Sequence, residues 1–66
     1  MPRTFRKEAI RHLQYAVRDT DRAQAQVVIA GGEYEVNYPE LYQHFVAIAS
    51  ALELVKESIT ALDAKL

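Results

Sequence analysis

The sequence predicts an all-α protein, an antiparallel two-helix hairpin of coiled-coil character. Apolar residues recur at alternating steps of four and three over residues 41–66, and a second pattern of the same period covers residues 4–30. Gly31 and Gly32 stand between the two patterns. A period of 3.5 is typical of helices that pack lengthwise, whereas a strand would alternate at every second residue. We therefore expect one domain over residues 1–66, with helices at about 4–30 and 39–65 and a loop at 31–38.

The second helix carries the stronger pattern. Its apolar seam has no polar interruption and consists of Leu41, Phe45, Ile48, Leu52, Val55, Ile59, Leu62 and Leu66. We expect this helix–helix seam to pack on the first helix, which has alanine at every seventh position of one row: Ala9, Ala16, Ala23 and Ala30. Small side chains let a neighbouring backbone approach closely, although alanine is also simply the best helix former.

Residues that favour helix ends stand at the boundaries of both patterns. Thr4 is a suitable N-cap for the first helix, because its hydroxyl can accept a hydrogen bond from a free backbone N–H. Gly31-Gly32 predicts the end of that helix in the left-handed conformation. For the second helix two alternatives remain: Asn37 in a capping box with Glu40 and with Pro39 in the first turn, or Tyr38 as the cap with Pro39 at the first helical position.

A further row of mostly small residues lies beside the seam on the second helix. It consists of Ala47, Ala51, Leu54, Ser58 and Ala61. A helix with two adjacent rows contacts two neighbours, and the hairpin supplies only one of them. We expect a second copy or another protein to lie along this row, completing a four-helix arrangement with Leu54 as the large anchor. Tyr42 belongs to a tyrosine cluster near the loop, which can either bind a partner or close the end of the bundle.

Composition bounds the class of protein. The 66 residues are 50% hydrophobic and 26% charged, which suits a folded chain, and the net charge of −1 gives no overall electrostatic bias. Without cysteine there is no disulfide framework. The N-terminal residues lack the apolar stretch of a secretory signal, so we expect a cytoplasmic protein. Chains this short usually need an oligomer or a partner for stability.

Basic residues concentrate in the first helix. Four of them share one helical face: Lys7, Arg11, Arg18 and Arg22. Asp19 and Asp21 interrupt this face, so we favour a solvated surface or a docking patch for an acidic partner over a nucleic-acid site. The alternative function is a homodimeric four-helix bundle that binds RNA or DNA through this face.

No constellation in the sequence predicts an enzyme, a cofactor or a metal site. There is no glycine-rich phosphate loop and no nucleophile paired with a base. His12 and His44 each follow a glutamate by four residues, but they are expected at different heights of the hairpin. We also expect no pocket of the usual ~300 Å³ or more in so small a hairpin.

The run Tyr42-Gln43-His44-Phe45, followed by Ala49-Ser50-Ala51-Leu52-Glu53, resembles the second helix of the small co-chaperones of type III secretion needle subunits. Those proteins are helical hairpins of similar length, and Gly31-Gly32 stands where their turn glycines stand. The resemblance implies a cytoplasmic chaperone component that pairs with a tetratricopeptide-like chaperone. Together they would keep a needle subunit from polymerising early.

Overall fold

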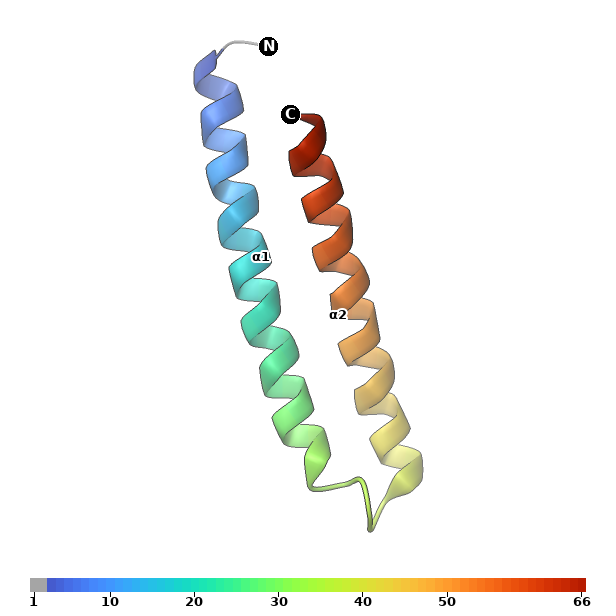
Figure 1. Cartoon of the computed structure of the whole chain (residues 1–66). Coiled ribbons are helices and arrows are strands. Elements are labelled where there is room, and N and C mark those ends of the chain that lie inside the picture. Colours follow the sequence, from blue (N-terminus) through green and yellow to red (C-terminus); the bar gives the residue numbers. More distant parts are fainter. Residues whose placement is uncertain (1–2) are drawn as a thin grey trace.

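The computed structural model describes residues 3–66 and contains two long helices joined by a short loop (Figure 1). Helix α1 spans Arg3–Gly32 and helix α2 spans Pro39–Lys65. The helices lie side by side and run antiparallel, so the start of α1 and the end of α2 lie at the same end, which we call the open end (Figure 1). The predicted all-α hairpin is confirmed. It is an elongated body of 54 × 15 × 10 Å.

Each helix turns a half-buried face toward the other. On α1 the residues that are not exposed are Ala9, Ile10, Leu13, Ala16, Val17, Thr20, Gln24, Val27 and Gly31. On α2 they are Tyr42, Phe45, Ala49, Leu52, Lys56, Ile59 and Asp63, and Leu66 follows directly after the helix. The steps on α2 alternate between three and four, which keeps one side of a helix against its neighbour over many turns.

The helix starts differ in part from what the sequence predicts. Thr4 lies inside α1, which begins one residue earlier, so it is not the N-cap. At α2 the second alternative is correct, because Tyr38 is the N-cap and Pro39 occupies the first turn. No side chain caps this helix by a hydrogen bond. Proline suits the position because its missing N–H would have had no partner within the helix.

The two glycines do not act as the sequence suggests. Helix α1 continues through Gly31 and Gly32, and no glycine of the described chain has a positive φ angle, so the left-handed end is wrong. Gly31 instead lies where α1 closely approaches Phe45 of α2. A Cβ atom built there would lie 2.7 Å from Cβ of Phe45, a contact too short for real side chains. Gly32 has open space around it.

The loop folds back over this close approach. The backbone N–H of Tyr34 donates to the carbonyl of Gly31 at 2.9 Å, and the N–H of Tyr38 donates to the carbonyl of Tyr34 at 3.0 Å. The ring of Tyr34 stacks on Phe45 with 5.3 Å between ring centres. Tyr34 therefore closes this end of the hairpin, which is one of the two roles that the sequence allows for the tyrosines.

The hairpin has no interior of its own. Among the described residues no hydrophobic side chain is fully buried. Its radius of gyration is 15.6 Å, whereas a compact chain of this length would have about 11 Å. None of the described helices combines the length and the apolar character needed to cross a bilayer.

Candidate interaction surface

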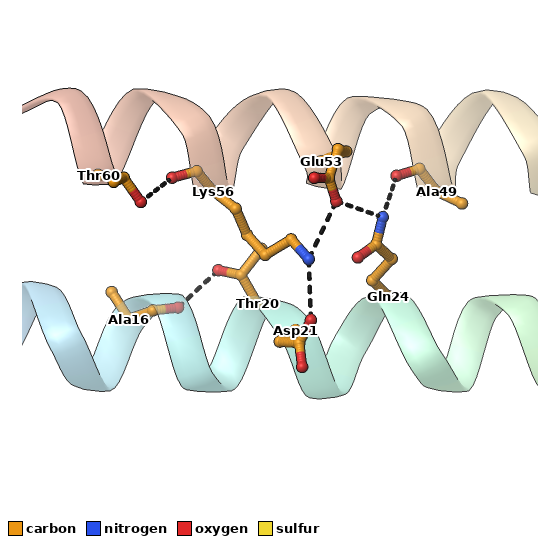
Figure 2. Close-up of polar contacts among 8 residues, drawn as sticks. All are labelled: Ala16, Thr20, Asp21, Gln24, Ala49, Glu53, Lys56 and Thr60. Atoms are coloured by element: carbon orange, nitrogen blue, oxygen red, sulfur yellow. Dashed lines mark hydrogen bonds and ion pairs between the residues drawn. The ribbon is translucent and has the colours of Figure 1, made fainter.

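One side of the helix pair is joined by polar contacts, and we call it the bridged side (Figure 2). The ammonium group of Lys56 lies 2.8 Å from a carboxylate oxygen of Asp21 on α1 and 3.0 Å from one of Glu53 on α2. The side-chain amide of Gln24 donates to the carbonyl of Ala49 and to Glu53, both at 3.0 Å. These contacts set which turn of α1 lies opposite which turn of α2.

The charges in this cluster support one another. Hydrogen bonds from Lys56 and then from Gln24 lower the pKa of Glu53 below its ordinary value of 4.5. Hydrogen bonds to Asp21 and then to Glu53 raise the pKa of Lys56 above its ordinary value of 10.5. The side chain of Lys56 is only 18% exposed, although it is charged. A charged group between two helices is typical of a contact that selects one register.

On the opposite side of the hairpin lie two rows that contain no charged residue, and we call this side the apolar side. Helix periodicity places the row Ala9, Ala16, Ala23 and Ala30 on the flank of α1 that lies away from Asp21. It places the row Leu41, Ile48, Val55 and Leu62 on the flank of α2 that lies away from Glu53. The two rows therefore run beside each other along the hairpin. The pairing of Lys56 with Asp21 puts Val55 at the level of Ala23.

The predicted seam divides between two surfaces. Phe45, Leu52, Ile59 and Leu66 are half-buried against α1, but the other four members remain in water. Leu41 is 50% exposed, Ile48 51%, Val55 46% and Leu62 48%. A helix presents two neighbouring rows to a partner that packs along it. On α2 one of these rows is that of Phe45, Leu52 and Ile59. The other consists of Tyr42, Ala49, Lys56 and Asp63, so the row of Leu41 lies outside the contact.

The residues predicted to bind a partner lie mainly on the outer surface of α2. Ala47, Ala51, Leu54, Ser58 and Ala61 are all exposed, and Leu54 is 63% exposed. Tyr42 is separate from them, because it is half-buried on the face toward α1. The exposed row that contains Leu41 carries more apolar bulk than this outer row, and it lies nearer to α1.

The basic face of α1 is exposed at all four of its positions, namely Lys7, Arg11, Arg18 and Arg22. Two of its members are engaged within the helix. Arg11 forms an ion pair with Glu8 that raises the pKa of the arginine and lowers that of the glutamate. The guanidinium of Arg18 lies 5.9 Å from the ring centre of Tyr15.

The structure contains hollows larger than the sequence led us to expect. One of 410 Å³ lies on the bridged side near the loop, between Gln24, Gly31, Phe45 and Glu53, so the expectation of no such volume is wrong. It is a groove open to solvent. Within residues 3–66 no three His, Cys, Asp or Glu side chains gather closely enough to hold a metal ion.

The sequence contains a signal for the apolar side, but the prediction assigned both of its rows to the contact between the two helices. Alanines at every seventh position of one helix, and large apolar residues at every seventh position of the other, are both free of charge. Two such rows in an antiparallel hairpin fall on the same side once the facing rows are known.

Comparison of the chain with protein-family models, with curated proteins and with solved structures gave no match.

Proposed function

We propose that this chain is a protein–protein interaction subunit, a hairpin that completes a helical bundle with another polypeptide. One observation carries the proposal: the apolar side stays in water, and within the described part of the chain no hydrophobic side chain is fully buried. A row of half-exposed leucine, isoleucine and valine that continues over three heptads is a contiguous apolar patch, and such patches mark interaction sites. Covering it would give the hairpin the interior that it lacks.

The resemblance of residues 42–53 to needle co-chaperones supports a more specific form of this proposal. The protein would act in the cytoplasm as one component of a chaperone, together with a tetratricopeptide-like protein and a secretion needle subunit. The two resembling runs, residues 42–45 and 49–53, lie on α2 on either side of Ile48, so a partner on the apolar side would lie close to them. We propose no catalytic role and no cofactor.

A photoreactive amino acid placed at Ile48 tests the general proposal in cells that produce the protein. The matched control places it at Glu57, which is also exposed on α2 but points away from the apolar side. We expect ultraviolet light to give a covalent adduct from position 48 and little from position 57. Mass spectrometry then shows whether the adduct contains a second copy, a tetratricopeptide-like protein or another protein. Equal labelling at both positions, or none at position 48, would contradict the proposal.

A further inference from the structure

Charge is distributed unevenly along the hairpin. Residues 23–52, which form the loop end, contain the acidic residues Glu33, Glu35 and Glu40 and no lysine or arginine. All eight basic residues and the remaining six acidic ones belong to the two segments at the open end. The molecule is thus acidic at the loop and basic at the open end, although its net charge is only −1. The long axis of 54 Å keeps these ends several Debye lengths apart in one molecule.

The exposed area matches what a dimer of this chain would bury. The hairpin exposes 5321 Å², whereas a compact protein of 7.5 kDa exposes about 4,250 Å². The excess is about 1,000 Å² per chain, and a stable interface buries about 800 Å² on each partner. One further hairpin of the same size is sufficient to remove this excess.

We propose that the apolar side is covered by a second copy of this chain, with its long axis reversed. The inference rests on the proposed function and names its partner and geometry. A two-fold axis across the hairpin, at the level of Ala23 and Val55, brings the acidic loop end of each copy beside the basic open end of the other. The reverse choice, with both loops at one end, places two acidic ends together. Complementary charge thus selects the reversed orientation.

The same axis produces even packing layers. Ala16 of one copy lies at the level of its own Leu62, and the axis brings Ala30 and Ile48 of the second copy to that level. The central layer contains Ala23 and Val55 from both copies. The three central layers then each combine two alanines with two large residues, so that this part of the interior has a constant volume. The bridged side remains in solvent, where its charges are hydrated.

Two neighbouring substitutions test which face is used. Val55→Glu puts a charge in the central layer, while Leu54→Glu puts the same charge on the outer surface of α2. In sedimentation equilibrium we expect the unmodified chain and Leu54→Glu to be dimers, and Val55→Glu to dimerise more than about 100-fold more weakly. A dimer lost only with Leu54→Glu would overturn the choice of face. An unmodified chain that is still monomeric at about 100 μM would overturn the choice of a second copy.

Val55→Glu can unfold the hairpin as well as separate the dimer. A second experiment therefore measures the relative orientation of the two copies in a variant whose apolar side is unchanged. The chain has no cysteine, and Glu35→Cys in the exposed loop therefore accepts a single spin label. In the reversed dimer the two labels are expected about 45 Å apart at 1.5 Å per helical residue. A label distance below about 30 Å would overturn the orientation. Photocrosslinks from Ile48 to a different protein only would overturn the homodimer while leaving the proposed function intact.

Discussion

At the scale of single residues, Gly31 shows how the absence of a side chain sets the distance between the helices. Its Cα lies against Phe45, and the ring of Phe45 is covered in turn by Tyr34. The next residue, Gly32, has no neighbour in the space where a side chain would be. The two adjacent glycines therefore serve different purposes, one in packing and one at the helix end.

Replacing each glycine with alanine separates these purposes. Gly31→Ala should lower the free energy of unfolding by about 1–3 kcal/mol, because the new methyl group overlaps Cβ of Phe45. Gly32→Ala should leave it unchanged or raise it by up to about 1 kcal/mol, since alanine is the better helix former. Urea denaturation followed by circular dichroism measures both. Equal effects of the two substitutions would show that the close approach at Gly31 does not exist.

The cluster of Lys56, Asp21 and Glu53 makes stability depend on pH in a definite direction. Because the pKa of Glu53 is lowered in the folded chain, its stabilising contribution is present above pH 4.5 and is lost as the pH falls through the lowered pKa. Because the pKa of Lys56 is raised, its contribution is present below pH 10.5 and is lost as the pH rises through the raised pKa. Between these limits the cluster contributes a constant amount.

Glu53→Gln tests the acid limb of this dependence. The amide can still accept from Gln24 but cannot titrate, so the fall in melting temperature between pH 5 and pH 3 should be smaller than in the unmodified chain. Glu57→Gln is the control, because Glu57 forms no ion pair within residues 3–66. An unchanged acid limb in Glu53→Gln would show that this carboxylate does not stabilise the folded state.

At the scale of the helices, the main feature is the rotation of α2 about its own axis. This rotation directs Phe45, Leu52 and Ile59 toward α1 and leaves the row of Ile48 and Val55 in solvent. The polar contacts of Gln24 and Lys56 accompany this rotation, because both side chains lie between the helices on the bridged side (Figure 2). Because of this rotation, the apolar side of the hairpin is exposed to solvent.

Two leucines of α2 differ only in the face on which they lie, so they test the rotation. Leu52→Ala should lower the free energy of unfolding by about 1–3 kcal/mol, since a half-buried side chain loses part of its contact with α1. Leu54→Ala should change it by less than about 0.5 kcal/mol, because Leu54 lies on the outer surface. Thermal melts by circular dichroism compare them. A larger loss for Leu54→Ala would place the contact on the other face.

At the scale of the whole molecule, we expect the hairpin to be stable only if its apolar side is covered. None of the hydrophobic side chains in residues 3–66 is fully buried, so the hydrophobic effect contributes little free energy, and ordering each residue costs about 1.5 kcal/mol. Folding and association should therefore be coupled.

This coupling makes the melting temperature depend on concentration. In dilution from about 100 μM to 1 μM the melting temperature of the pure chain should fall steadily, as mass action requires for a folded oligomer in equilibrium with unfolded monomers. Differential scanning calorimetry or circular dichroism can follow it. A sharp transition at one temperature over this whole range would show that the hairpin is stable by itself.

Much of the fold follows from local patterns, and the site follows only in part. The apolar period of 3.5 predicts both helices and their antiparallel pairing, and the sequence gives Tyr38 with Pro39 as one of two starts for α2. The left-handed end at Gly31-Gly32 is wrong, because a glycine can equally be required by a neighbour that is distant in sequence. Phe45 is such a neighbour. The face of α2 that meets α1 could not be predicted from apolar spacing, because one of the two rows that face α1 contains Lys56 and Asp63.

The sequence by itself determined the hairpin, the row of alanines on α1, the row of large aliphatic residues on α2, and the separation of acidic and basic ends. All of these depend on spacing along one chain, which helix geometry converts directly into position. Only the tertiary structure decided that Lys56 and Asp63 face α1 while Ile48 and Val55 face solvent. That choice goes with contacts between residues far apart in sequence, such as Gln24 with Ala49 and Lys56 with Asp21, and the spacing of apolar residues along one chain does not contain such contacts.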